Sequence, residues 1–182
     1  DVKVLGAGNG SVITVKYNAT LDDTAVIGST GNPNEAYLVF SNNPNGEGYG
    51  KTPKDKNIVF TYKVDANKVD PDLNSLPGAA FELFKHVKDA SGNLTWESQG
   101  IANAKQNPDG TYTITDAAKT NFEWKGIDDG DYKLVEVVTP AGYNTMEPLL
   151  FTVSATHSET DDNPVLITLS GNTTTGDVIT GN

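Results

Sequence analysis

Residues 130–143 read GDYKLVEVVTPAGY, and the first nine of them have the side-chain alternation of a β-strand. Successive side chains of a strand point to opposite faces of its sheet. One face therefore carries Tyr132, Leu134, Glu136 and Val138. Three of these four are apolar or aromatic, which predicts that this face packs against a hydrophobic core. The PAGY that follows indicates a turn, because proline cannot continue a central strand.

Other short runs alternate in the same way and are separated by turn residues. We expect strands at residues 57–69, 79–87, 94–98, 111–115, 130–138, 149–155 and 165–169. Residues 89–93 are typical of a hairpin turn, and residues 116–120 are expected to form one helical turn capped by Asp116. This arrangement predicts an all-β protein with an immunoglobulin-like β-sandwich.

The first part of the chain has too few strands for a complete sandwich. Residues 11–20 alternate strictly, and a second strand is expected at residues 36–42. The long strand at residues 57–69 then crosses from this part into the next. Two or three strands are too few to stand alone. We therefore predict two domains, residues 1–62 and 63–182, of which the first sandwich is incomplete.

The composition excludes several classes of function. The 182 residues carry a net charge of −11, which argues against nucleic acid and anionic membrane surfaces as partners. Cysteine is absent, so neither a disulfide framework nor a thiolate site is possible. No apolar run approaches the roughly 20 residues of a membrane span. The chain starts without a signal peptide, and we expect it to be a fragment of a longer protein.

Glu136 is unusual because it lies in a core-facing row, where an unpaired charge is costly to bury. Lys68 is a candidate partner, since it ends the inward row of the strand at residues 57–69. If that strand ends at Ala66, Lys68 reaches water instead. A shared core would allow either a buried salt bridge, which is weak evidence for stability, or a reaction.

The reaction follows from what burial does to the two groups. Burial lowers the pKa of an amine and raises that of a carboxyl group. A neutral amine is a nucleophile, and a neutral carboxylic acid can bind a carboxamide and transfer protons. With an asparagine beside them, the products are a Lys–Asn amide bond and free ammonia.

Two motifs carry a resemblance to a known family. Lys68-Val69-Asp70 leading to LPGAAFEL (residues 76–83) resembles the opening of a Cna B-type domain. YKLVE (residues 132–136) followed by PAGY (residues 140–143) resembles its E-box strand. Upstream, YNATL (residues 17–21) and YLVFSNNP (residues 37–44) resemble the last strands of the preceding, Cna A-like domain in sortase-assembled Gram-positive backbone pilins.

The resemblance implies tandem Cna-type β-sandwiches with self-formed isopeptide bonds. Lys68 would be the amine donor and Glu136 the catalytic acid of the second domain, and Asn42 the acceptor of the first. The family's second acceptor lies on its very last strand, so the acceptor here is expected to be Asn172 or Asn182, or to lie beyond Asn182 in the longer protein. The donor lysine and the acid of the first domain would lie on earlier strands.

The implied function is structural. The chain would be a shaft subunit of a pilus on the bacterial cell wall, outside the cell, joined to neighbouring pilin subunits by a sortase. The alternative is an adhesin module that binds a host ligand, and an exposed aromatic groove would favour it. Each cross-link forms once per molecule, so no enzyme with turnover is expected.

No cofactor or metal is expected. Residues 128–131 and 159–162 are acidic enough to bind Ca²⁺, but neither run fits a 12-residue EF-hand loop. His86 and His157 lack the spacing of a zinc site. Neither a nucleophile elbow nor a phosphate-binding loop is present.

Overall fold

The computed structural model describes residues 6, 8–43, 45–158 and 163–170. Every regular element in this part of the chain is a strand, which confirms the all-β prediction. No helix in it is long and apolar enough to cross a membrane. The strands are β1 (Asn32–Ala36), β2 (Val39–Ser41), β3 (Tyr49–Lys51), β4 (Asp55–Val59), β5 (Tyr62–Asn67), β6 (Ala80–Lys88), β7 (Leu94–Ala102), β8 (Ala104–Gln106), β9 (Tyr112–Ile114), β10 (Asn121–Ile127), β11 (Gly130–Val138), β12 (Leu149–Val153), β13 (Ala155–His157) and β14 (Leu166–Leu169).

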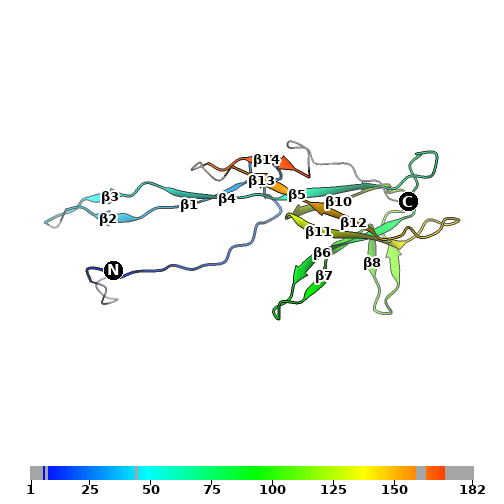
Figure 1. Cartoon of the computed structure of the whole chain (residues 1–182), viewed down its shortest axis with the longest axis horizontal. Coiled ribbons are helices and arrows are strands. Elements are labelled where there is room, and N and C mark those ends of the chain that lie inside the picture. The colour runs from blue at the N-terminus through cyan, green and yellow to red at the C-terminus, as the bar shows by residue number, and fades with distance from the viewer. Residues whose placement is uncertain (1–5, 7, 44, 159–162, 171–182) are drawn as a thin grey trace.

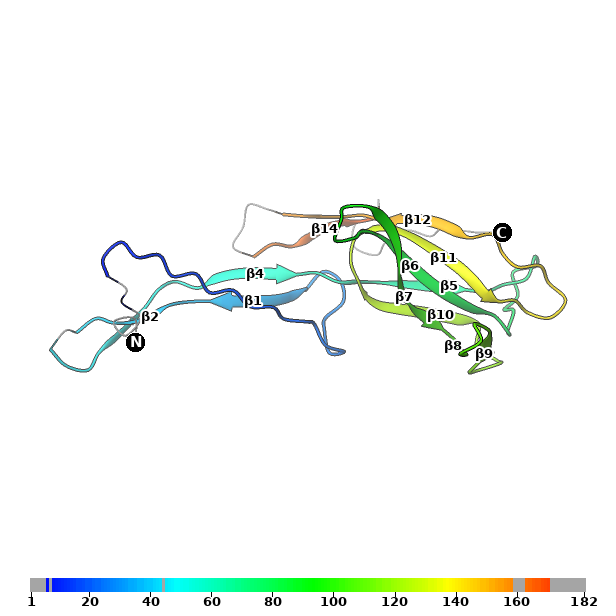
Figure 2. The same cartoon turned by 90° about the horizontal axis from the view of Figure 1, so that it is seen from below.

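A sandwich begins at β5. One layer is an antiparallel four-stranded sheet in the order β12-β11-β6-β7, and the opposite layer contains the β5–β10 pair (Figure 2). β11 occupies the predicted residues, and its buried face pairs Leu134 with Leu83 and Glu136 with Phe81 on β6. The core between the layers consists of Tyr62, Ala79, Phe81, Leu83, Phe122, Trp124, Ile127, Tyr132, Leu134, Val153 and Leu166.

The strand β10 is absent from the prediction. Its residues alternate over a short run, and Phe122 and Trp124 turn inward onto the core. The predicted helical turn just before it is wrong. Residues 117–118 form a turn in which Asp116 Oδ1 accepts the N–H of Ala118. β10 starts at Asn121, so the chain has no room to continue a helix.

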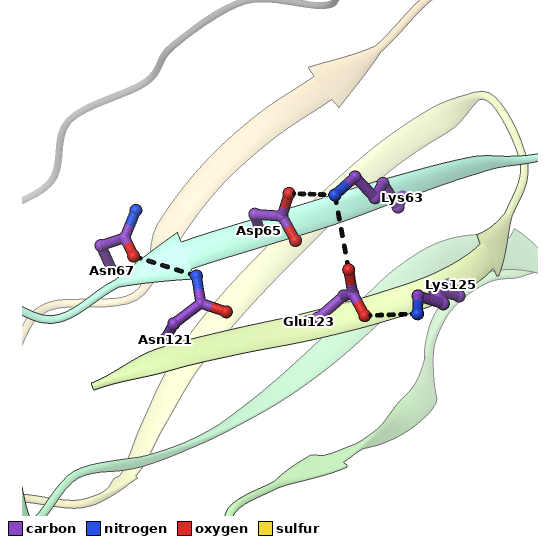
Figure 3. A network of polar contacts seen from close by, with 6 residues as sticks. All are labelled: Lys63, Asp65, Asn67, Asn121, Glu123 and Lys125. Atoms are coloured by element: carbon purple, nitrogen blue, oxygen red, sulfur yellow. Dashed lines mark hydrogen bonds and ion pairs between the residues drawn. The ribbon is translucent and has the colours of Figure 1, made fainter. Parts of the chain in front are cut away.

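The outer face of the β5–β10 pair is polar and exposed, as the alternation predicts for β5. Lys63 Nζ lies 2.6 Å from the Asp65 carboxylate and 3.4 Å from Glu123 on the neighbouring strand. Glu123 also pairs with Lys125 at 2.8 Å, and Asn121 donates to Asn67 (Figure 3). These exposed pairs contribute little to stability, and they mark this face as solvent-facing.

The part before β5 forms a narrow two-stranded ribbon that extends away from the sandwich (Figure 1). β1 pairs with β4, and β2 pairs with β3. The predicted strand at residues 57–69 is divided into β4 and β5. Between them, the carbonyl of Thr61 accepts a hydrogen bond from the N–H of Gly28 in a loop, and not from a neighbouring strand. We call residues 8–59 the ribbon.

The strand predicted at residues 11–20 is wrong. These residues are exposed and belong to no hydrogen-bonded ladder in the described structure. One side-chain contact, between the Tyr17 hydroxyl and Asn34, holds them against β1. An alternating sequence favours an extended chain, but a strand also needs a partner for its backbone groups. The strand predicted at residues 36–42 is shorter, since Tyr37 and Leu38 separate β1 from β2.

Candidate functional site

The structure brings Lys68 and Glu136 together inside the sandwich. Lys68 Nζ lies 3.0 Å from Glu136 Oε1, with 14% of the lysine side chain and none of the glutamate side chain exposed. Lys68 follows β5, and Glu136 lies on β11 in the opposite layer. The two charges therefore face each other at one end of the core.

Backbone hydrogen bonds keep Lys68 on the inward row after β5 ends. Its N–H donates to the carbonyl of Thr120, and its own carbonyl accepts the N–H of Leu76, both at 2.9 Å. A further bridge joins Val69 to Ser75. Because the chain stays extended through these contacts, Lys68 points inward with Val64 and Ala66 rather than into water.

The loop after Lys68 is closed by one aspartate. The Asp70 carboxylate accepts the backbone N–H groups of Asn74 and Asp72 at 2.9 Å. The hydrogen bond from the Asn74 N–H, above all, holds the pKa of Asp70 below its usual value. This loop fixes the return of the chain to Leu76 and thereby the position of Lys68.

The two oxygens of Glu136 have different surroundings. Oε2 accepts the backbone N–H of Met146 at 2.7 Å and the hydroxyl of Thr139 at 3.4 Å. Oε1 is buried and has no aligned hydrogen-bond donor among the described residues, although the Lys68 ammonium is 3.0 Å away. The short distance between Lys68 Nζ and Glu136 Oε1 makes them an ion pair, but their geometry does not meet the angles of a hydrogen bond. One lone pair of Oε1 is therefore free to accept from another group.

The segment between β11 and β12 closes over this carboxylate. Pro140 is buried against Gly78, and Tyr143 N–H donates to the Pro140 carbonyl, which completes the predicted turn. Beyond the turn, the hydroxyls of Thr139 and Thr145 lie 2.8 Å apart. We call residues 139–148 the cover loop.

This arrangement suits proton transfer between an amine and a carboxylate. The pair is enclosed by the core on one side and by the cover loop on the other, so water is largely kept from the amine. A lysine that gives a proton to an adjacent carboxylate becomes a nucleophile. The carboxyl group can then return that proton to a leaving group.

The candidate asparagines are not brought to this pair by the described residues. Asn42 is exposed just after β2, where its N–H donates to Gly48, so its role as an acceptor stays a prediction. Asn172 and Asn182 lie outside the described residues. Asn103 is buried, but both ends of its amide are bonded at the corner between β7 and β8, where it has a structural role.

Sequence reasoning missed the groups of the cover loop. Thr139 and Thr145 are separated from Glu136 by a turn whose path the alternation of β11 does not predict. The one available signal was the position of Thr139, three residues after a buried acid and directly before a proline.

Comparison with known proteins places the sandwich in a family of prealbumin-like fold domains. Residues 62–164 match the family described as SpaA: Prealbumin-like fold domain. The chain is 28% identical over 144 residues to the trypsin-resistant surface T6 protein of Streptococcus pyogenes serotype M6, covering 71% of this chain and 23% of that protein. It thus spans about a quarter of the length of that relative.

Two solved structures are also similar. The T6 backbone pilin of serotype M6 Streptococcus pyogenes has a TM-score of 0.47 and 26% identity, over 78% of this chain and 30% of that one. The pilus 2b backbone protein of group B streptococcus has a TM-score of 0.38 and 22% identity, over 63% of this chain and 44% of that one.

Proposed function

Because this chain belongs to the family of SpaA prealbumin-like fold domains, we propose that it is part of the shaft of a pilus. In this proposal the protein is a backbone subunit on the cell wall of a Gram-positive bacterium, joined to neighbouring subunits by a sortase. The similarity to a streptococcal surface protein supports this assignment. The enclosed Lys68–Glu136 pair is the observation that carries it.

The pair would form an isopeptide bond with an asparagine of the same domain. Lys68 Nζ passes a proton to Glu136 Oε1 and attacks the side-chain carbonyl carbon of the asparagine. The bond from that carbon to Nδ2 breaks and the proton on Glu136 goes to the leaving nitrogen, which departs as ammonia. The carboxylate then takes the second proton from Nζ, so that the new amide nitrogen keeps one hydrogen. The open lone pair of Oε1 supports this role. Asn172 and Asn182 are the proposed acceptors.

Such a bond would strengthen the shaft against pulling. It would join the segment after β5, at the start of the sandwich, to the end of the chain. A cross-link of this kind removes conformational entropy from the unfolded state, as a disulfide does. Unlike a disulfide, it needs no oxidising compartment, which agrees with the absence of cysteine.

The proposed organisation has two domains, residues 1–62 and 63–182. The first would be the end of a Cna A-like sandwich with Asn42 as its acceptor. The exposed apolar side chains of the ribbon, such as Leu38 and Phe40, support the idea that further strands cover them in the full-length protein.

The described residues favour a shaft over an adhesin. Trp124 is buried in the core. Trp96 stacks on His86 at 4.5 Å and lies below the ammonium of Lys133, so its ring already has partners. No specific contact surface for a host ligand follows from these residues.

Intact-mass measurement tests the proposal. We expect the protein to be lighter than its sequence by one ammonia, and Glu136→Ala and Lys68→Met each to have the full sequence mass. Glu123→Ala is the matched control, because it removes an exposed, ion-paired glutamate and should keep the loss. A parent protein with the mass of its sequence would refute cross-linking in this chain.

A further inference from the structure

The orientation of the Glu136 carboxylate depends on the cover loop. We propose that Thr139, supported by Thr145, is a positioning residue for cross-linking: its hydroxyl fixes Oε2 so that Oε1 faces the Lys68 amine. This inference rests on the proposed isopeptide function. Neither threonine belongs to the Lys–Glu–Asn set that the sequence motifs imply.

The direction of the hydrogen bonds follows from the chemistry of the groups. An ionised carboxylate can only accept, so the Thr139 hydroxyl donates to Glu136 Oε2. Its single proton is then used, and the Thr145 hydroxyl must donate to Thr139 Oγ1 across 2.8 Å. Thr145 is exposed, so this short chain runs from the buried acid to the surface.

The hydroxyls of Thr139 and Thr145 restrain the last side-chain torsion of Glu136, which the packing of the core does not fix. The last torsion of a glutamate side chain is broad, so packing alone does not fix the angle at which the carboxylate plane faces the amine. Oε2 receives donors from Met146 and Thr139, whereas no described residue other than Lys68 approaches Oε1 as a donor. The Met146 bond, at 2.7 Å, has the short length of a hydrogen bond to an ionised acceptor, whereas the Thr139 bond, at 3.4 Å, is longer and weaker. Together, the two donors present Oε1 to the amine.

The cover loop also has contacts that involve neither Glu136 nor the two threonine hydroxyls. Pro140 is buried, and the turn is closed by the bond from the Tyr143 N–H. The loop then returns to the sheet at β12, whose Leu149 pairs with Leu134. Thr139→Val keeps the shape of the side chain and removes only the hydroxyl, so it separates positioning from loop structure.

The rate of ammonia loss measures the proposal. The chain is synthesised in a short cell-free pulse, samples are quenched in acidic denaturant at intervals, and intact masses are recorded. We expect Thr139→Val to slow the loss roughly fivefold, the factor that an ordinary hydrogen bond of about 1 kcal/mol supplies, because the contact of 3.4 Å is long for a bond to a charged group. Thr139→Ser should restore the rate, and Thr145→Val should slow it less.

Two controls separate positioning from a general effect on the fold. Thr152→Val removes another hydroxyl that donates to a carboxylate, that of Asp131 on the outer face of the sheet, and should leave the rate unchanged. In the Lys68→Met/Glu136→Met background, which has neither the cross-link nor a carboxylate for Thr139 to position, adding Thr139→Val should leave the melting temperature unchanged. A clear drop there would make Thr139 structural and would overturn the inference.

The outcomes distinguish this inference from the function beneath it. If the parent never loses ammonia, the cross-link and the role of Thr139 both fail. If the parent loses ammonia and Thr139→Val does so at the parental rate, only the role of Thr139 fails.

Discussion

The ribbon and the sandwich are built from equally alternating sequence, yet only the sandwich has a core. Every residue of the buried hydrophobic cluster lies at position 62 or later. In the ribbon, Val12 is 90% exposed and Phe40 is 44% exposed, although both lie in runs that alternate. Alternation creates a face, and burial requires a second layer to cover it. The sandwich supplies that layer with β5 and β10.

Ion pairs show the same difference between the two regions. Lys54 and Glu35 pair in the ribbon with most of the lysine exposed to water. Lys68 and Glu136 pair in the sandwich with the glutamate fully enclosed. The chemistry is identical, but solvent screens the first pair and not the second. The predictions that follow compare matched changes in the two regions.

Removing one member of the enclosed pair should have the largest effect. Lys68→Met leaves the Glu136 charge buried without a partner, which costs about 3–5 kcal/mol in addition to any loss of the cross-link. Adding Glu136→Met should recover most of the stability lost to the unpaired charge, because no buried charge remains. Denaturant unfolding followed by tryptophan fluorescence measures both, since Trp96 and Trp124 lie in the sandwich.

The ribbon provides the control for that prediction. Lys54→Met should leave the midpoint of sandwich unfolding unchanged, because its partner Glu35 stays in water. If the double variant at positions 68 and 136 were no more stable than Lys68→Met, the penalty would not come from an unpaired charge.

Matched phenylalanine truncations should follow next in size. Phe122 is fully buried and its ring packs at 4.9 Å against Phe81, so Phe122→Ala should destabilise the sandwich by about 3–5 kcal/mol. Phe40 lies over Gly50 on the neighbouring ribbon strand and is 44% exposed, so Phe40→Ala should change sandwich stability by less than about 0.5 kcal/mol. Equal effects in urea titrations would mean that the ribbon and sandwich share one core.

The alternation predicted much of the sandwich. It placed β11 at residues 130–138 and put Glu136 on a buried face, because a period of two is decisive where one face is covered. The same rule put Lys68 on the inward row of β5, although the backbone bonds to Thr120 and Leu76 that keep it there are not visible in a sequence.

The failures have a common cause. Residues 11–20 have the pattern of a strand but no hydrogen-bonded neighbour in the described structure, and pairing is a property of two segments. β10 was not predicted because its inward residues, Phe122, Trp124 and Ile127, break the period of two, where an irregularity in the register shifts the strand between Lys125 and Ile127. The link from Thr139 to Thr145 depends on the path of a turn, which local periodicity does not contain.

Limited proteolysis should show the difference between the regions without a mutation. Trypsin cleaves after lysine, and cleavage needs a segment that opens locally. Lys16 and Lys54 are exposed outside any ladder, whereas Lys63, Lys125 and Lys133 lie within paired strands. We expect the first cuts in the ribbon, on the order of tenfold faster than those in paired strands. A first cut within residues 62–67 or 121–138, identified by fragment mass, would contradict this order.

Acid should destabilise the sandwich partly through Asp89. The backbone N–H of Asn93 holds the pKa of this carboxyl below its usual value, so its contribution to stability is present above about pH 4 and is lost as the pH falls through the native pKa. Asp89→Asn should reduce the fall in melting temperature on acidification, which we call the acid limb of sandwich melting.

Asp22 provides the comparison from the region before the ribbon strands. Bonds from Thr24 lower its pKa in the same direction. Because its loop belongs to the part without a core, Asp22→Asn should leave the acid limb of sandwich melting as it is. A response equal to that of Asp89→Asn would couple the two regions.

The smallest change should stabilise the sandwich alone. Asp70–Asn74 and Asp89–Asn93 form loops with the same hydrogen bonds, but the fourth position is Leu73 in one and Gly92 in the other, at φ of 64° and 85°. A left-handed conformation costs a leucine about 1–2 kcal/mol, and the greater freedom of unfolded glycine offsets about 0.5–1 kcal/mol. Leu73 is exposed and loses no packing. Leu73→Gly should therefore stabilise the sandwich by about 0.5–1 kcal/mol, while Gly92→Leu destabilises it and neither changes cleavage after Lys16. Loss of stability in Leu73→Gly, measured by tryptophan fluorescence in urea, would show that the side chain has a stabilising role that outweighs the strain.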